Sequence, residues 1–255
     1  MKKFVISLLS ILSVIAGRIE KETDDRDRRS LERARKAVEK IKHWIDVYMV
    51  APLVTLSVSI SKGNKKIGRV LNVSLAPIIT CANCSKCMLC CYDIKAVLQY
   101  VNVAKARARN TVILIRDREK YFSEIIKACE KRRTNKYLRW HVSGDIVDVD
   151  YFDHMVKIAK MFPDFRFWTY TKAYRIVNKW CELNGKNSIP ENLSVMFSEW
   201  KGVTMVNPFG FPVFRCVMHD EPEPVNGFKC PGNCDVCLKN GTGCPYHMDA
   251  YVNEH

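Results

Sequence analysis

The sequence predicts an α/β protein with a mostly parallel, barrel-like sheet, covering helices and a cysteine-rich C-terminal extension. After residue 51, short apolar runs alternate with amphipathic segments of helical period, the pattern in which crossover helices join parallel strands. The 255 residues, of which 47% are hydrophobic, suffice for one well-buried domain. Nine of the 12 cysteines fall in two short runs, which favours metal ligation over a disulfide framework.

Residues 1–17 are predicted to be an apolar leader or anchor. Lys2 and Lys3 precede an apolar run that ends in the small residues Ala16 and Gly17, as in a secretory signal. Three interpretations stay open: a signal or anchor, a helix packed on the domain, or a start codon assigned too far upstream. The run is short for a transmembrane helix, and export would oxidise free thiols. We therefore expect a cytoplasmic protein without stable membrane insertion, unless the run is a true anchor.

A charged amphipathic helix is predicted within residues 18–50. Residues 18–30 carry dense charge of mixed sign, as in a solvated helix or a linker. Further along, apolar residues recur at spacings of three and four: Leu31, Ala34, Val38, Ile41, Ile45 and Tyr48. We expect this stripe to dock on the domain, and pairing with a second copy is the alternative.

The metal-binding α/β core is predicted over residues 51–220. Apolar runs favour strands over residues 54–60, 70–75, 138–142, 165–169, 193–197 and 213–217. The helical faces between them include Cys129 and Cys181, which we interpret as core residues and not ligands. We likewise expect Trp140, Trp168 and Trp180 in the core and not as base-stacking platforms.

The first cysteine run directly follows the strand expected over residues 70–75, so its thiols lie at the carboxyl edge of the sheet, where α/β folds place their sites. It contains Cys81, Cys84, Cys87, Cys90 and Cys91. A compact loop of thiolates suits an iron-sulfur cluster. The equal spacing from Cys81 to Cys90 also fits a tetrahedral zinc site. Zinc knuckles usually pair two CxxC units across a longer span, so we favour a 4Fe-4S cluster.

The extension, residues 221–255, holds the second cysteine run. Pro, Gly and Cys dominate this stretch, and we expect no regular elements in it, only a metal to hold it. The predicted ligands are Cys230, Cys234, Cys237 and Cys244. Four thiolates complete a coordination sphere, which indicates structural zinc or a second, fully ligated cluster. The spacing leaves open whether the two runs share one cluster.

Polar residues also end three successive strands at the same sheet edge. The candidate catalytic residues are His141, Asp145 and Lys172, and the candidate cofactor-binding residues are Ser143, Gly144, Tyr170 and Ser198. A histidine can move a proton, a carboxylate can accept from an amine or ribose, and Lys172 can pair with an anion. In the alternative interpretation, Asp145 or Asp148 caps a helix and His141 is a satisfied core residue.

The net charge of +14 favours an acidic partner such as nucleic acid. Cluster-ligating thiolates would offset part of this charge, and the basic residues are scattered along the chain. We therefore favour a small-molecule ligand over nucleic acid.

Taken in order, the motifs resemble those of the phage gene product 88-like family, which is regarded as a family of iron-sulfur proteins with poorly characterised function. The pattern runs from about residue 56 to residue 246 and includes residues 57–64, Lys66 to Arg69, Arg109 with Asn110, residues 141–145, Tyr170 to Lys172 and the C-terminal cysteines. The resemblance implies a phage or prophage origin and a cluster at Cys81, Cys87 and Cys91. The first fifty residues, Cys84 and Cys90 lie outside the pattern.

The leading hypothesis is an iron-sulfur enzyme in which Cys81, Cys87 and Cys91 leave one iron open to a small molecule. If that molecule is S-adenosylmethionine, its amino and carboxylate groups chelate the iron and one electron generates a radical, with Asp145 and Lys172 holding the ligand. A zinc- or cluster-stapled binding module that contacts nucleic acid or a host protein is the second hypothesis. An electron-transfer protein is the third.

Overall fold

The computed structural model describes residues 2–65, 67–218, 221–239, 244 and 248–253, with side chains omitted for residues 2–9 and 235. Lys66 and residue 246, which belong to the family pattern, lie outside the described residues. The same holds for parts of the 1–17 and 221–255 segments.

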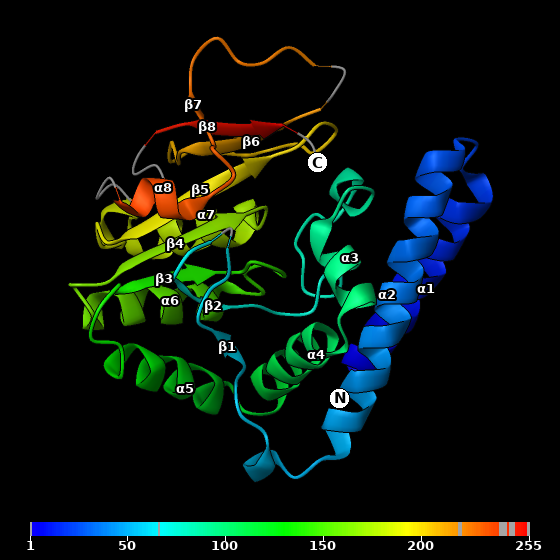
Figure 1. The fold of residues 1–255 in the computed structure, drawn as a ribbon, viewed down its shortest axis with the longest axis horizontal. Coiled ribbons are helices and arrows are strands. Elements are labelled where there is room, and N and C mark those ends of the chain that lie inside the picture. The colour runs from blue at the N-terminus through cyan, green and yellow to red at the C-terminus, as the bar shows by residue number, and fades with distance from the viewer. Residues whose placement is uncertain (1, 66, 219–220, 240–243, 245–247, 254–255) are drawn as a thin grey trace.

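The described residues contain one eight-stranded sheet at the centre of the fold (Figure 1), in the order β1-β2-β3-β4-β5-β6-β8-β7. All pairings are parallel except that of β1 with β2. The strands are β1 (Ile60–Ser61), β2 (Leu71–Val73), β3 (Tyr137–Trp140), β4 (Arg166–Thr171), β5 (Leu193–Glu199), β6 (Val213–Val217), β7 (Phe228–Lys229) and β8 (Ala250–Asn253). This confirms the predicted α/β fold with a mostly parallel sheet.

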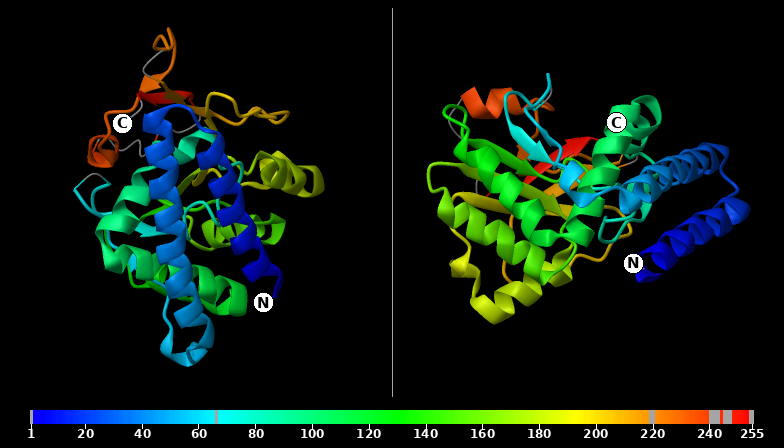
Figure 2. Two further views of the ribbon diagram at one scale, coloured as in Figure 1. Left: turned by 90° about the vertical axis from the view of Figure 1, so that its right-hand side faces the viewer. Right: turned by 90° about the horizontal axis from the view of Figure 1, so that it is seen from below.

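Both faces of the sheet are covered, but by different layers. The connecting helices are α3 (Tyr92–Gln99), α4 (Val101–Arg116), α5 (Arg118–Glu130), α6 (Val149–Met161) and α7 (Tyr174–Asn184). Helices α4, α5 and α6 lie on one side, and the C-terminal segment with α8 (Cys234–Lys239) lies on the other (Figures 1 and 2). Because side chains alternate along each strand, Trp140 faces the main core while Trp168 joins a smaller cluster with Cys244 and Ala250.

An antiparallel helix pair stands at one side of the sheet, formed by α1 (Lys2–Lys21) and α2 (Asp25–Val50) (Figures 1 and 2). The predicted stripe of α2 is buried from Leu31 to Ile45, and α2 contacts α3 and α4. Ile15 of α1 lies in the same core. The docked interpretation of the stripe is thus confirmed. None of the helices among the described residues is long and apolar enough to span a membrane.

The strand expected over residues 54–60 was mostly wrong. A short 3-10 helix, Leu53–Thr55, and the two-residue strand β1 replace it. The backbone N–H of Val58 donates to Glu124 Oε2 at 2.6 Å, and that of Ser59 donates to Asn110 Oδ1 at 2.7 Å. Because side chains of α5 and α4 satisfy these donors, the segment needs no neighbouring strand.

The expectation of no regular elements in the extension was also wrong, since β7, α8 and β8 all lie within it. Strand β8 lies between β6 and β7 and pairs with both. The Pro- and Gly-rich extension cannot make these hydrogen bonds locally, and β6, which is distant in sequence, supplies them. Local sequence patterns do not reveal such a partner.

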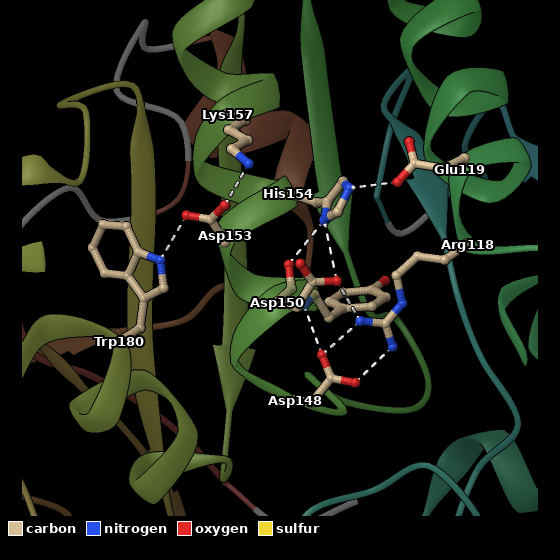
Figure 3. A network of polar contacts seen from close by, with 9 residues as sticks. Arg118, Glu119, Asp148, Asp150, Asp153, His154, Lys157 and Trp180 are labelled. Atoms are coloured by element: carbon tan, nitrogen blue, oxygen red, sulfur yellow. Dashed lines mark hydrogen bonds and ion pairs between the residues drawn. The ribbon is translucent and has the colours of Figure 1, made fainter. Parts of the chain in front are cut away.

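Helices α5 and α6 are joined by a charged network (Figure 3). Arg118 donates to both carboxylate oxygens of Asp148, at 2.6 and 2.9 Å, and to Asp150 at 2.6 Å. Asp148 is the N-cap of α6 and accepts from the backbone N–H of Tyr151 at 2.8 Å. One carboxylate therefore starts α6 and fixes it against α5.

Further contacts extend this network to α7. His154 stacks on Phe122 with ring centroids 4.2 Å apart and lies 3.6 Å from Glu119. The indole N–H of Trp180 donates to Asp153 at 3.0 Å. The helical layer is thus held by polar bonds as well as by apolar packing.

We predict that Asp148→Ala lowers the free energy of unfolding by about 1–2 kcal/mol, because it removes both the cap of α6 and the bidentate partner of Arg118. Urea denaturation measures the change. Glu119→Gln is the control, since Glu119 is 87% exposed and its substitution should stay within about 0.5 kcal/mol. Equal effects of the two substitutions would contradict the capping role.

Candidate functional site

The first cysteine run lies between β2 and α3, and α4 holds the chain where it leaves β2. Asn110 Nδ2 donates to the carbonyl of Ser74 at 2.9 Å. The backbone N–H of Ala76 donates to Thr111 Oγ1 at 2.9 Å. Both α4 side chains are buried, so the start of the thiol loop is fixed by hydrogen bonds shielded from water.

The loop itself is held at both ends. Ile78 has φ 65°, which is strained for a β-branched residue, and its backbone N–H donates to Cys81 Sγ at 3.3 Å. At the far end, Cys91 is the N-cap of α3. Asp93 in the first turn pairs with Arg107 at 3.0 Å, with both side chains largely buried.

The loop thiols gather around Cys84. The neighbouring thiols of Cys81 and Cys87, together with burial, raise the pKa of Cys84. The Cys84 contact, together with the charge of Lys172, lowers the pKa of Cys87 to about 5 despite burial. Burial raises the pKa of Cys91 to about 12. Cys81, Cys84 and Cys87 therefore form one thiol group, with Cys91 beside Cys81.

Lys172, at the end of β4, is the charged partner of this thiol group. Burial opposes its charge, but the neighbouring thiol of Cys87 and the carboxyl of Asp145 raise the pKa of Lys172. Its ammonium lies 5.6 Å from the centroid of the Trp200 ring. Asn83 of the thiol loop donates to the Lys172 carbonyl at 2.6 Å. Lys172 thus lies beside the first cysteine run.

Asp145 holds Lys172 in place. Its buried carboxylate accepts from Thr171 Oγ1 at 2.5 Å, from the Lys172 backbone N–H at 2.9 Å and from the Ile146 N–H at 2.8 Å. Burial raises the pKa of Asp145 to about 6. These bonds join the turn after β3 to the end of β4.

Ser143 and Gly144 bring that turn against the thiol loop. The Ser143 carbonyl accepts from the Leu75 N–H at 2.9 Å, and its buried hydroxyl has no hydrogen-bond partner. Gly144 has φ 79°, and a Cβ there would lie 2.6 Å from Thr80 Oγ1 and 2.7 Å from Leu75 Cβ. Only glycine fits this position.

His141 and Ser198 both form hydrogen bonds with other side chains of the protein. His141 Nε2 lies 2.9 Å from the Tyr151 hydroxyl and Nδ1 lies 3.4 Å from Thr169 Oγ1, which matches the satisfied core residue of the alternative interpretation. Burial lowers the pKa of His141 to about 3. Ser198 Oγ accepts from the indole N–H of Trp200 at 3.0 Å.

Tyr170 belongs to the second thiol group and not to the first. Its hydroxyl contacts Cys244 Sγ. Burial and the charges of Cys234 and Cys230 help raise the pKa of Cys244 to about 12. The pKa of Cys237 is also raised, mainly by burial and further by the charges of Cys230 and Cys234. The four C-terminal cysteines named from the sequence thus lie close enough for their charges to interact.

Arg139 of β3, which the sequence analysis did not single out, lies beside this group. Its guanidinium is 5.0 Å from the centroid of the Tyr170 ring. Despite the cost of burial, Tyr92, Tyr170, Cys234 and Cys244 raise the pKa of Arg139. The sequence feature that could have pointed to Arg139 is a charged residue within a strand whose neighbouring residues are apolar. Asn83 and Trp200 offered none, because both lie in irregular segments.

As positioned here, no three His, Cys, Asp or Glu side chains among the described residues form a group that could hold a metal ion. The chemical type of the available ligand atoms suits an iron-sulfur cluster or zinc. Both the first and the second thiol group consist of cysteine sulfurs and lack the oxygen ligands that Mg²⁺ and Ca²⁺ require. The charge of Lys172 would offset part of the charge of a thiolate-bound cluster.

The fold and the site define an α/β protein of parallel topology with one thiol group at the carboxyl edge of the sheet and another on its second face. The gene product 88 family model matches residues 31–203, and the chain belongs to this family. No curated protein matches, and no solved structure does.

The matched region differs from the pattern expected from the motifs. It begins within α2 and so includes part of the first fifty residues, which the motif pattern leaves out. The packing of α2 on α3 and α4 places the start of the matched region in the core of this chain. The match ends before Cys230, so the C-terminal thiols lie beyond it.

We predict that the wild-type protein loses stability below pH 6.5 more steeply than His141→Asn. The neutral imidazole stabilises the fold fully above the unfolded pKa of about 6.5, and this contribution is lost as the pH falls toward the folded value, at about 1.4 kcal/mol per pH unit. Urea unfolding at several pH values between about 4.5 and 7.5 gives the slope of the unfolding free energy against pH for each protein. Asparagine tolerates the φ of 55° at this position. Parallel slopes would show that His141 is not buried as a neutral ring.

Gly144→Ala should destabilise the protein by about 2–5 kcal/mol, through both backbone strain and overlap with Thr80 and Leu75. Gly210→Ala is the matched control, because Gly210 has φ 64° but no atom within 4 Å of the added Cβ. Thermal unfolding of both variants separates strain from overlap. If the two lose equal stability, the close approach of Gly144 to the thiol loop is not a constraint.

Proposed function

We propose that the protein is an iron-sulfur enzyme in which Cys81, Cys87 and Cys91 hold a 4Fe-4S cluster that is open to a small molecule. One observation carries the proposal: the thiols of the loop after β2 gather beside Lys172 at the carboxyl edge of a parallel sheet. Ligand sites of parallel α/β folds lie at this edge. Cys84, which contacts both Cys81 and Cys87, is the alternative third ligand.

A four-iron cluster with three protein ligands supplies one open iron and single electrons when it is bound. We propose S-adenosylmethionine as the ligand of the open iron. Lys172 is the cation that binds its carboxylate. Asp145 acts as a positioning residue, because it fixes the backbone of Lys172. The unpartnered Ser143 hydroxyl beside the loop is available to a polar group of the ligand.

For the C-terminal thiols, we propose a closed site that holds zinc or a second cluster. Four thiolates leave no position for a substrate. Such a site would hold α8 and the surrounding irregular chain on the sheet, or relay electrons if it contains iron.

The alternative function is a metal-stapled module that binds nucleic acid or a host protein through basic residues. One surface pocket offers basic residues for such contact. Arg132, Arg133 and Lys136 line it together with the acidic Glu130 and Asp164, and Lys136 pairs with Asp164 at 3.2 Å. Electron transfer without catalysis is the third possibility, in which the cluster has no small-molecule ligand.

The decisive experiment is anaerobic purification followed by iron, sulfide and zinc analysis. Electron paramagnetic resonance of the dithionite-reduced protein is then recorded with and without S-adenosylmethionine. Iron with equal sulfide and a spectrum altered by the added ligand supports the enzyme. Iron with an unaltered spectrum favours electron transfer, and zinc without sulfide favours the binding module.

The ligand set predicts a pattern of metal loss. Cys81→Ala, Cys87→Ala and Cys91→Ala should each remove most of the iron of the first site, while Cys84→Ala should retain it. Cys129→Ala is the control, because Cys129 is a core thiol that is 1% exposed. Iron analysis of anaerobically purified variants measures the loss. Iron loss in Cys84→Ala with retention in Cys91→Ala would instead assign Cys81, Cys84 and Cys87.

A further inference from the structure

A row of polar side chains crosses four adjacent strands on the face of the sheet that the C-terminal segment covers. Asn72 of β2 is in register with Arg139 of β3, Arg139 with Trp168 of β4, and Trp168 with Ser194 of β5. Residues in register on parallel strands point to the same face. Trp168 belongs to the cluster that contains Cys244 and Ala250, which identifies this face.

Each residue of the row has a buried polar atom without a hydrogen-bond partner: Asn72 Nδ2, Arg139 Nε, Trp168 Nε1 and Ser194 Oγ. Asn72, Trp168 and Ser194 are 4%, 1% and 3% exposed. The described residues contain ten such atoms, and four of them fall in this row. Buried polar groups nearly always have a partner, so four adjacent exceptions indicate a missing one.

The chemistry of the row specifies that partner. All four atoms can donate a hydrogen bond, three of them can only donate, and Arg139 adds a positive charge. An oxyanion matches such a set, because its oxygens accept several bonds and are stabilised by the guanidinium. With strands about 4.8 Å apart, the row extends over about 14 Å. This length suits a small molecule with further acceptors on either side of its anionic group.

A surface pocket lies near the amino ends of β2 and β3. It has a volume of about 330 Å³ and is lined by Arg69, Asn135, Tyr137, Leu238 and Lys239. Tyr137 is two residues before Arg139 on β3 and therefore points to the same face. The two cations in the pocket lining, Arg69 and Lys239, attract an anion to this face.

We infer that the row formed by Asn72, Arg139, Trp168 and Ser194 is a binding site for a small molecule that carries a carboxylate or a phosphate. The site is distinct from the first thiol loop. It lies on the same face of the sheet as the second thiol group, since Cys244 belongs to the cluster that contains Trp168. Arg139 binds the oxyanion, Trp168 and Asn72 donate to its oxygens, and Ser194 contacts the end of the ligand.

The test uses the full chain, purified anaerobically, with inorganic phosphate and succinate as separate probes and chloride at equal ionic strength as the reference. Isothermal titration calorimetry should show binding of at least one probe by the wild type. Stronger binding of phosphate indicates a phosphate-bearing ligand, and stronger binding of succinate indicates a carboxylate. Arg139→Met should weaken binding by roughly tenfold or more, and Trp168→Phe by roughly threefold or more.

Trp140→Phe is the matched control. Trp140 is fully buried and its Nε1 also lacks a partner, but it lies on the helix-covered face of the sheet. Its substitution should leave probe binding unchanged. Both variants replace an indole by the smaller phenyl ring and lose the same volume, but only Trp168→Phe removes a donor from the row. The inference is overturned if neither anion binds above chloride, or if the two Trp variants bind the probe equally well.

Iron analysis of the same samples keeps this result separate from the proposed function. If the protein contains no iron but binds the probe through the row, only the proposed iron-sulfur function is contradicted. An iron-loaded protein that fails to bind either probe contradicts only the row.

Discussion

The turn after β3 is the constraint on which the thiol loop depends. Asp145 binds the end of β4 through Thr171 and the Lys172 backbone, and Gly144 lies against Leu75 and Thr80 at the start of the loop. Three strand ends and the cysteine run are thus fixed by one buried turn. A carboxylate bonded on both oxygens is costly to move, because each lost bond would leave a buried acceptor unpaired. The position of Lys172 beside the thiols follows from this rigidity.

The sequence predicted the sheet well because strands β2 to β6 carry runs of apolar residues, as expected for strands covered on both faces. It predicted β1 and the extension poorly because their hydrogen bonds come from distant groups, the Asn110 side chain for residue 59 and strand β6 for β8. The first thiol group could be located from the order of strand and cysteines. The assignment of Tyr170 to the second group could not, since it depends on how the extension folds over the sheet.

The two thiol groups differ in their surroundings although both are rich in cysteine. The first stands beside Lys172 and Asp145 at the end of β4. The second lies against Tyr170 and Arg139 on a covered face. A cation beside each group lowers the electrostatic cost of gathering several thiolates. This difference in surroundings is the basis for proposing an open site at the first group and a closed site at the second.

The placement of β8 between β6 and β7 has a consequence for biosynthesis. The ribosome must translate residues 250–253 before β8 can pair with either neighbour. Strands β2 to β6 and the thiol loop emerge earlier and can associate while translation continues, since domains begin to fold from the N-terminal side during synthesis. For a time the nascent protein therefore has a complete first thiol group and an uncovered sheet face. The polar row is therefore covered only in the last stage of folding, after the C-terminal strand has been made.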